Sequence, residues 1–264
     1  MSFLVNPYSY ATGCDADAIA FLSAAGITDA TITSAICTLV STMKSNGTWA
    51  KMSAIYPFVG NTASQQKWNL KDPRDLDAAF RLNFVGGWTH SANGALPNGT
   101  NAYADTFLNP TTTLALNSSH ISYYSRTIGG SNSYDIGAGA DPSAYLALNA
   151  NNTINFRILV NTGSVSNFAN IDARGNFIAN RTASNVMNGF KNATKVINTS
   201  SASIARPNRS IYIGALNFQT AGGAVLFSSK QCAFSTIGSG LTDAEAAALY
   251  NSIQAMQTTL SRQV

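Results

Sequence analysis

Side chains able to perform acid–base chemistry are scarce in this chain. Its 264 residues include a single glutamate, Glu245, and only two histidines, His90 and His120. Eleven aspartates and three cysteines complete the groups on which general acid–base and nucleophilic catalysis mainly rely. Such catalysis requires several of these groups close together, with shifted pKa values. The composition therefore predicts a protein that binds other molecules and is not an enzyme.

The one glutamate fits a structural role. Thr242 is followed three residues later by Glu245, which is the capping-box pattern of a helix start. Leu249, Ile253 and Met256 then recur at helical spacing. We therefore expect Glu245 to stabilise the first turn of a C-terminal helix.

Three aspartates form the densest group of carboxylates. Asp72, Asp75 and Asp77 lie within six residues, and calcium is bound in proteins by six to eight oxygen ligands. The alternative is that these carboxylates form surface ion pairs, with Asp75 pairing with Arg74 or Arg81. The sequence favours ion pairs and predicts no cofactor, with calcium as the alternative.

Aromatic residues suggest a different chemistry, the binding of sugars. His90 and Trp88 lie in the glycine-rich stretch 86–94, and an exposed tryptophan is a common platform on which a sugar ring stacks. We predict Trp88, Tyr103 and Tyr123 as glycan contacts. For Trp88 the sequence favours a second interpretation, in which the ring fills the end of a hydrophobic core.

Two further polar residues lie on predicted strands. His120 has no cysteine or second histidine near it in the sequence, so a metal-binding or catalytic role is disfavoured. Arg181 is expected to pair with a carboxylate such as Asp105.

The cysteines and the N-terminus indicate in which cellular compartment the protein is made. Cys14, Cys37 and Cys232 are widely spaced and form no C-x-x-C motif. Buried free thiols, and hence synthesis in a reducing compartment, are the expectation. The N-terminus lacks the pattern of a signal peptide, and no stretch approaches the roughly 18 apolar residues of a membrane helix, so no membrane insertion is expected.

Charged residues make up 11% of the chain, and hydrophobic residues 45%. The net charge is +4, but the basic residues are scattered, and their densest group is Arg206, Arg209 and Lys195. A nucleic-acid partner would require a basic face, so none is predicted.

The beginning of the chain differs from the rest. Asp15 can cap a short helix, and Thr28 or Asp29 can cap a second helix that runs to about Ser45. Isolated short helices are marginal in water, so both must pack on something. We predict residues 1–70 to be a helical docking segment that contacts a partner.

The remainder, 71–264, has a β pattern. Short runs rich in β-branched and aromatic residues alternate with Gly, Asn and Pro, without crossover helices between them. The fold class predicted is mainly β, an antiparallel two-sheet jelly-roll sandwich with a small N-terminal helical segment and a C-terminal helix. The predicted strands cover 78–84, 102–107, 120–127, 134–137, 143–148, 153–160, 176–182, 194–198, 211–218 and 224–233.

Four stretches resemble the laminin-G-like, concanavalin A-like jelly rolls, in the order of that family. They are LPNGTNAYADT at 96–106, GNFIANRT at 175–182, IYIGA at 211–215 and FSTIGSGLTD at 234–243. With KWNLKDP at 67–73 and helices ahead of it, the chain looks most like structural proteins of tailed bacteriophages.

The resemblance implies adhesion modules, carbohydrate binders, virion components and some glycanases. Jelly-roll glucanases present two Glu on one strand, and retaining enzymes need two carboxylates about 5 Å apart. Glu245 lies in no predicted strand, so this mechanism is missing. The leading hypothesis is a non-enzymatic virion protein, a capsid decoration, head fibre or tail component, with other virion proteins, copies of itself and host-surface glycans as partners. The alternatives are a lectin-like glycan binder and, less favoured, a glycan-cleaving enzyme.

Overall fold

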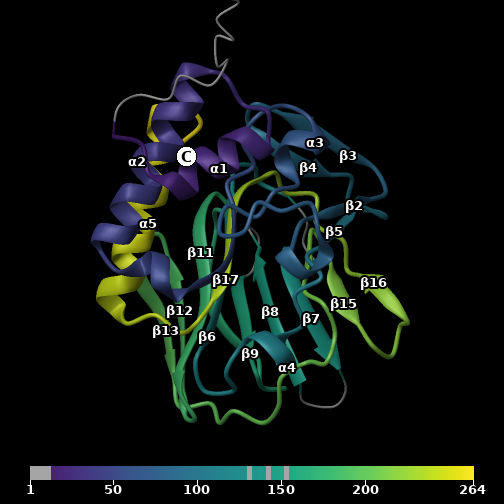
Figure 1. Cartoon of the computed structure of the whole chain (residues 1–264). Helices are drawn as coiled ribbons and strands as arrows, with labels where there is room; N and C mark the ends of the chain where they lie inside the picture. Colours follow the sequence, from purple (N-terminus) through teal and green to yellow (C-terminus); the bar gives the residue numbers. More distant parts are fainter. Residues whose placement is uncertain (1–12, 130–132, 141–143, 152–154) are drawn as a thin grey trace, which may run out of the picture.

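Two β-sheets packed face to face form the body of the protein (Figure 1). The computed structural model describes residues 13–129, 133–140, 144–151 and 155–264. The predicted fold class, a mainly β antiparallel sandwich, is confirmed. Within the described ranges, no helix is long and apolar enough to cross a membrane.

The first sheet has eight strands. Its order is β13-β12-β11-β6-β17-β4-β3, and β1 also pairs with β17. The strands are β1 (Met52–Tyr56), β3 (Trp88–Ser91), β4 (Gly94–Pro97), β6 (Ser119–Ser125), β11 (Gly175–Ala183), β12 (Val186–Lys191), β13 (Thr194–Thr199) and β17 (Cys232–Gly238).

The second sheet has nine strands. Its order is β10-β9-β8-β7-β14-β5-β2, with β15 pairing in parallel with β7, and β16 pairing with β15. The strands are β2 (Asn83–Val85), β5 (Tyr103–Asp105), β7 (Ile136–Ala140), β8 (Ala144–Ala150), β9 (Asn155–Val160), β10 (Ser166–Ala169), β14 (Tyr212–Ile213), β15 (Leu216–Phe218) and β16 (Gly223–Val225).

Three helices cover one side of the sandwich. They are α1 (Ala16–Ala24), α2 (Ala30–Ser45) and α5 (Asp243–Thr259); the short helices are α3 (Ala63–Gln66) and α4 (Pro110–Thr113), with 3₁₀ turns at Thr48–Lys51 and Asp77–Ala79. The caps are those predicted, with Asp15 and Asp29 accepting from backbone N–H groups of α1 and α2. Thr242 and Glu245 form the predicted capping box of α5.

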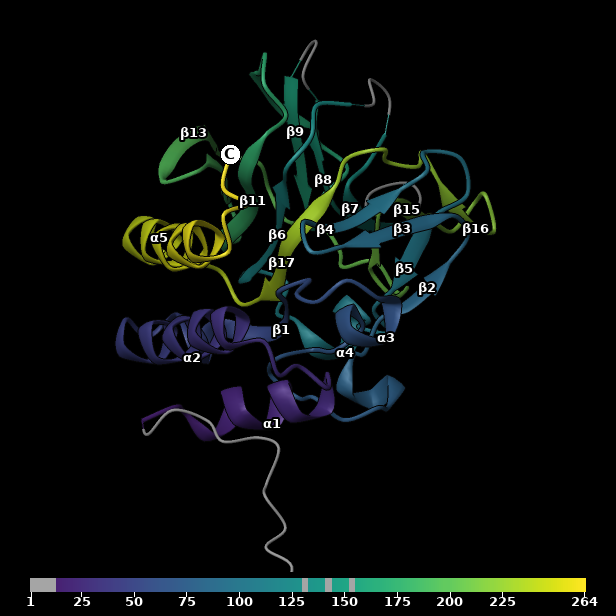
Figure 2. The ribbon, with the colours of Figure 1, turned by 90° about the horizontal axis from the view of Figure 1, so that it is seen from above.

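Each face of the eight-stranded sheet packs against a separate hydrophobic core. Residues such as Ile121, Phe177 and Ile237 point inward, toward the nine-stranded sheet. Residues on the opposite face, such as Ile178 and Phe234, pack under the three helices. Figure 2 shows α1, α2 and α5 gathered on one side, away from β15 and β16. Because the helices bury their apolar faces on their own domain, they need no second subunit for that purpose.

The cysteine prediction is wrong for two of the three residues. Cys14, just before α1, and Cys37, within α2, form a disulfide, with their Cα atoms 5.1 Å apart. The packing of α1 against α2 brings together positions that are 23 residues apart, which spacing alone could not show. Cys232 is the buried free thiol that was expected.

Several strand predictions need correction. The run 78–84 was predicted as a strand, but Asp77–Ala79 is a 3₁₀ turn and only β2 follows it. Residues 1–70, predicted to be a helical docking segment, also contain β1, which pairs with β17 in the sheet. The boundary at residue 70 stays a prediction, although β1 lies before it.

Candidate functional site

Trp88 joins the edges of the two sheets. Its indole N–H donates to the carbonyls of Val85 (3.1 Å) and Tyr103 (3.2 Å), and its ring packs edge-on against Phe84 with centroids 5.3 Å apart. Gly214 has φ +87°, and a Cβ there would lie 3.0 Å from the indole, so the glycine makes room for Trp88. Trp88 therefore takes the core-end position that the sequence favoured, while its role as a glycan contact stays a prediction.

Tyr103 and Tyr212 form a stacked pair, here called the tyrosine platform. Their ring centroids lie 4.4 Å apart with an interplanar angle of 20°. Both are half-buried, whereas their neighbours Ala104 and Ile213 are fully buried in the core. Because side chains alternate along a strand, both tyrosines project from the outer face of the nine-stranded sheet. Of the predicted glycan contacts, Tyr103 is therefore placed at a partly open aromatic surface.

A carboxylate lies beside the platform. Asp105 is opposite Tyr212 in the ladder between β5 and β14, and its Oδ1 accepts from the N–H of Phe107 at 2.8 Å. Burial raises the pKa of Asp105. Burial and the Asp105 carboxylate together raise the pKa of Tyr212 to about 12. At neutral pH Tyr212 therefore remains a phenol that can donate a hydrogen bond to a ligand.

A guanidinium from the segment before β14 is held by a buried amide. The Nε of Arg209 donates to Oδ1 of Asn217 at 2.9 Å, and Nδ2 of Asn217 donates to the carbonyl of Ser210 at 2.8 Å. Asn217 is only 3% exposed, so it is a fixed support. The charge of Arg209 lowers the pKa of Tyr212, against the larger effects of burial and Asp105. Asn217 is in register with Ala138, so this amide lies on the core-facing side of the sheet.

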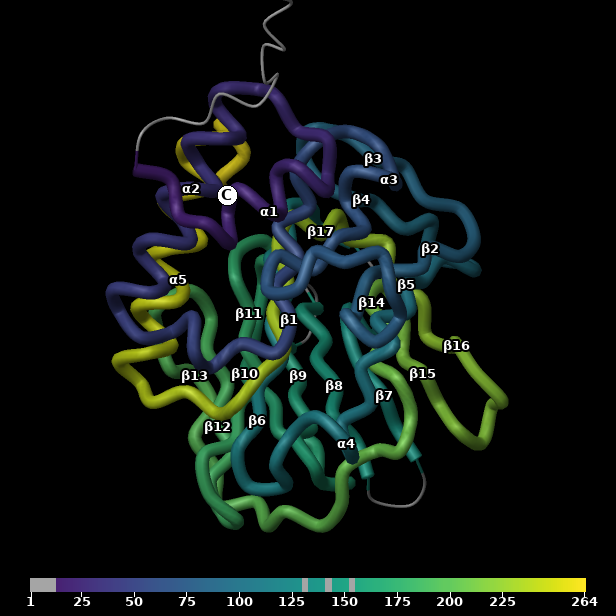
Figure 3. Tube along the Cα trace, in the orientation of Figure 1, coloured from purple at the N-terminus to yellow at the C-terminus, as the bar shows by residue number. Residues whose placement is uncertain are grey.

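A second aromatic pair shares this outer face. Gly139 of β7 is paired with Tyr145 of β8 and with Phe218 of β15, and these two rings stack with centroids 5.8 Å apart. Figure 3 shows the β15–β16 hairpin on the side of the molecule opposite α2 and α5. The outer face thus carries two aromatic pairs, one on the neighbouring strands β5 and β14 and one that spans β7 from β8 to β15.

The prediction for Tyr123 as a glycan contact is wrong. Its side chain is fully buried, and its hydroxyl donates to the carbonyl of Lys230 at 2.6 Å. Tyr123 points inward from β6 because its neighbours in the alternation, Ser122 and Tyr124, point toward the helices. It is a core residue of the sandwich.

Neither histidine is set up for catalysis. Nδ1 of His90 is 2.7 Å from Oε1 of Gln66, and burial lowers the pKa of His90. His120 is fully buried, with Nδ1 2.6 Å from the carbonyl of Ser239 and Nε2 3.0 Å from Oγ1 of Thr236. Burial lowers the pKa of His120 to about 4, so the ring is neutral at physiological pH.

The three clustered aspartates form ion pairs. Asp72 pairs with Arg74 at 2.5 Å, Asp77 with Arg81 at 2.7 Å, and Asp75 with Arg81 at 3.5 Å as well as with a lysine. In the part of the chain that the structure describes, no three His, Cys, Asp or Glu side chains form a group able to hold a metal ion. Asp141 lies outside the described residues.

Arg181 does not pair with a carboxylate, which corrects that prediction. It is fully buried, and it donates to backbone carbonyls, among them those of Val160 (2.7 Å), Ser184 (3.0 Å) and Ser201 (2.8 Å). The loop 200–204, remote in sequence, supplies one of these acceptors, so local pattern could not reveal them.

One carboxylate forms an ion pair in the core. Asp135 and Lys230 are both fully buried, with Nζ 2.9 Å from Oδ1. Ser228 donates to the same oxygen at 2.6 Å, and the N–H of Ala150 donates to Oδ2 at 2.7 Å. This pair links the residues just before β7 and β17, and hence the two sheets.

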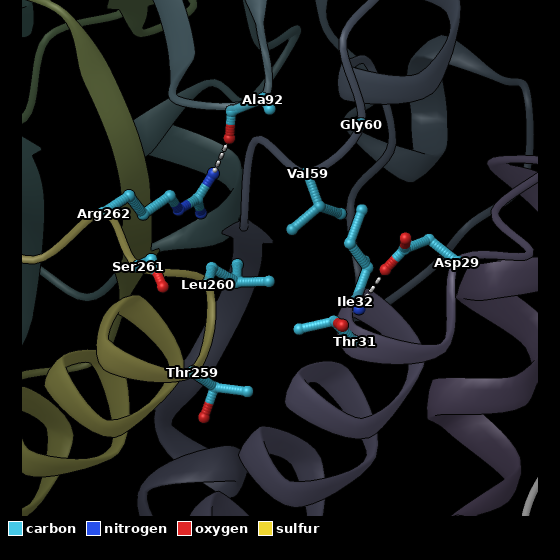
Figure 4. A pocket seen from close by; sticks show the side chains of 10 residues that line it. All are labelled: Asp29, Thr31, Ile32, Val59, Gly60, Ala92, Thr259, Leu260, Ser261 and Arg262. Carbon is cyan, nitrogen blue, oxygen red and sulfur yellow. Dashed lines mark hydrogen bonds between the residues drawn. The ribbon is translucent and has the colours of Figure 1, made fainter.

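A crevice of about 240 Å³ lies between α2 and the C-terminal turn (Figure 4). Its two charged groups are occupied, since Asp29 caps α2 and Arg262 donates to Gln257 and to four backbone carbonyls. Between them the walls are formed by apolar residues such as Ile32 and Leu260. The crevice therefore offers a sugar fewer free charged and aromatic groups than the platform does.

No protein-family model and no curated protein matches this chain. Among solved structures, it is similar to domain 4 of an extracellular arabinanase from Geobacillus stearothermophilus in complex with arabinotriose, with 14% identity, a TM-score of 0.51, and coverage of 75% of this chain and 98% of that domain. It is also similar to a mutant of Trypanosoma rangeli sialidase displaying trans-sialidase activity, with 14% identity, a TM-score of 0.55 and 84% of this chain covered. The chain spans 39% of that sialidase. At these identities the likeness shows the β-sandwich fold alone.

The sequence prediction missed most of the site. Tyr212 lies between two apolar residues, Ile211 and Ile213, and this alternation indicates a side chain that points outward. The same alternation places Tyr103 and Asp105 on one face. No local sequence pattern predicted the hydrogen bond between Arg209 and Asn217.

Proposed function

We propose that this protein is a non-enzymatic glycan-binding module, and that its ligand lies on the tyrosine platform. The observation that carries the proposal is the stacked, half-buried pair Tyr103 and Tyr212 on an outer sheet face, with Asp105 beside Tyr212. Because the two rings cover one face of each other, a sugar would stack on the outward face of one ring, while adjacent polar groups bond its hydroxyls.

The state of the acidic groups supports a binding role. Every Asp and Glu of the described residues accepts a hydrogen bond or an ion pair from the protein itself. Glu245 is engaged in its capping box and with Lys51 at 3.1 Å. The arabinanase domain that shares the fold was solved in complex with arabinotriose, which is consistent with a sandwich of this kind holding a sugar.

The virion setting, with other virion proteins and further copies of this chain as partners, stays a prediction from the family resemblance. The helices no longer argue for it, because α1 and α2 are packed on their own domain.

A glycan array followed by calorimetry tests the proposal. The double variant Tyr103→Ala, Tyr212→Ala should weaken binding of any captured glycan by roughly tenfold or more, because each aromatic contact is worth about 1 kcal/mol. Tyr250→Ala, which removes a half-buried tyrosine from α5, is the matched control and should bind like the wild type. Unchanged affinity in the platform variant would refute the proposed site, and an array without a single hit would refute the function.

A further inference from the structure

The nine-stranded sheet ends in an open edge at β10. Within the described residues, this strand (Ser166–Ala169) pairs with β9 on one side and with no strand on the other. The backbone N–H and C=O groups along an unpaired edge are a template for another extended chain, and proteins usually protect them with charged side chains or proline. Residues 162–171 include neither a charged residue nor a proline. This edge is therefore unprotected.

Large apolar side chains lie along the same edge. Val165 is 48% exposed, Phe168 is 38% exposed and Ile171 is 91% exposed. Phe168 lies opposite the buried Phe156 of β9, so it projects from the inner face of the sheet, at the open side of the core. When the strand is extended at both ends, Val165 and Ile171 project from the opposite face, because each is three residues from Phe168.

The spacing of these apolar residues is symmetric about Phe168. A two-fold axis at this position places Phe168 opposite its own equivalent, and Val165 opposite Ile171 of the second copy. An antiparallel pair in this register therefore gives every exposed apolar residue an apolar partner. The charged residues that follow, Asp172 and Arg174, pair with each other at 3.0 Å and would face uncharged residues of the second copy, so no like charges meet.

We propose that β10 is a dimerisation strand, which pairs antiparallel with β10 of a second copy of this chain and joins the two nine-stranded sheets edge to edge. A foreign peptide would satisfy the backbone groups as well, but a copy of this strand also brings the matching apolar pattern. The strand is short, so the contact is smaller than a standard interface of about 1,600 Å². We therefore expect a weak dimer, with a dissociation constant roughly in the micromolar range.

For the proposed function, on which this step rests, the dimer provides two binding sites on one side. The two-fold axis of an antiparallel strand pair is perpendicular to the sheet, so the outer faces of both sheets point the same way. Both tyrosine platforms then face one glycan-bearing surface. Two linked sites bind such a surface more tightly than one site does.

Sedimentation velocity of the full chain, at roughly micromolar to millimolar concentrations, tests the dimer. The wild type should show a reversible monomer–dimer equilibrium. Ile171→Lys, at a highly exposed side chain, should weaken dimerisation by roughly tenfold or more, because each dimer contains two contacts between Val165 and Ile171. Leu76→Lys is the matched control, since Leu76 is 50% exposed in the loop before the 3₁₀ turn at Asp77–Ala79; it should dimerise like the wild type.

Cysteine cross-linking tests the register. Phe168→Cys places two thiols directly opposite each other, whereas Asn167→Cys places them as diagonal neighbours, roughly 7–8 Å apart. Disulfides form between Cα atoms about 4.4–6.8 Å apart, so only Phe168→Cys should be captured as a covalent dimer under mild oxidation. The chain's own cysteines do not compete, because two form the disulfide and the third is buried.

A wild type that stays monomeric throughout would overturn the inference, and so would equal capture of the two cysteine variants or equal weakening by the two lysine variants. These measurements need no glycan, so their failure leaves the proposed function intact. On a dense glycan surface, the wild type should be retained roughly tenfold or more longer than Ile171→Lys, while both bind a short oligosaccharide equally in solution. Equal retention would contradict bivalent binding, whereas loss of all glycan binding would count against the proposed function and not against the dimer.

Discussion

Burial of His120 should make folding stability depend on pH. The side chain is fully buried between the eight-stranded sheet and the residues around Ser239, and its pKa is lowered to about 4. In the unfolded chain a histidine titrates near 6.5. Between these two values the unfolded state binds a proton that the folded state does not.

The sign and size of the effect follow from this difference. The unfolded state binds more protons below pH 6.5, so stability falls as the pH is lowered, and the loss is complete once the pH passes below about 4. A difference of about 2.5 pH units corresponds to a loss of about 3.4 kcal/mol from this one residue. That is a large share of the 5–15 kcal/mol typical of a domain.

Urea unfolding followed by tryptophan fluorescence between pH 7.5 and pH 4 measures this effect. The paired variant is His120→Asn, whose amide can still donate to the carbonyl of Ser239. It should be less stable than the wild type at pH 7.5, but the gap should close by about 3 kcal/mol at pH 4. Carboxylates such as Asp72, whose pKa is lowered mainly by Arg74, titrate equally in both proteins. Parallel pH profiles for the two proteins would refute the reasoning.

Three further outcomes are expected from equilibrium unfolding and hydrogen exchange. Lys230→Met should lower the free energy of unfolding by about 3–5 kcal/mol, because it leaves Asp135 buried and unpaired. Adding Asp135→Leu should recover most of that loss. Equal instability of the single and double variants would contradict this. Replacing Cys14 and Cys37 by Ser should lower the free energy of unfolding by about 3 kcal/mol, because the disulfide closes a loop with a 23-residue separation. Amide exchange should then be faster in α1 than in the sheets. Unchanged exchange in α1 would count against this prediction. Thr242→Ala should lower the free energy of unfolding by about 1 kcal/mol and fray the first turn of α5. Faster hydrogen exchange at the amides of that turn would report the fraying.

Patterns with a short range along the chain were the most predictive. The caps at Asp15, Asp29 and Thr242 were found because a cap and its backbone donors lie within three residues. The sandwich followed from repeated short strands without crossover helices, and both sheets confirm it. The strand β1 was missed because its pairing with β17 lies at the far end of the chain.

The site depends on contacts that sequence spacing does not contain. Tyr103 and Tyr212 are more than a hundred residues apart, and only the order β5-β14 in the sheet brings them together. Tyr123 was assigned to the surface because its strand, SHISYYS, has polar residues on both faces and yet is buried on both, so alternation could not show which side chains were accessible. The disulfide between Cys14 and Cys37 likewise depends on how two helices pack.

The most direct test of the account is to locate the bound sugar. Two-dimensional NMR of the protein, titrated with the oligosaccharide that binds best in calorimetry, reports the residues in contact. The account predicts that the largest shift changes fall on Tyr103 and Tyr212, on the outer face of the nine-stranded sheet. Shift changes confined to the crevice beside Arg262, or to the helical side of the sandwich, would contradict it.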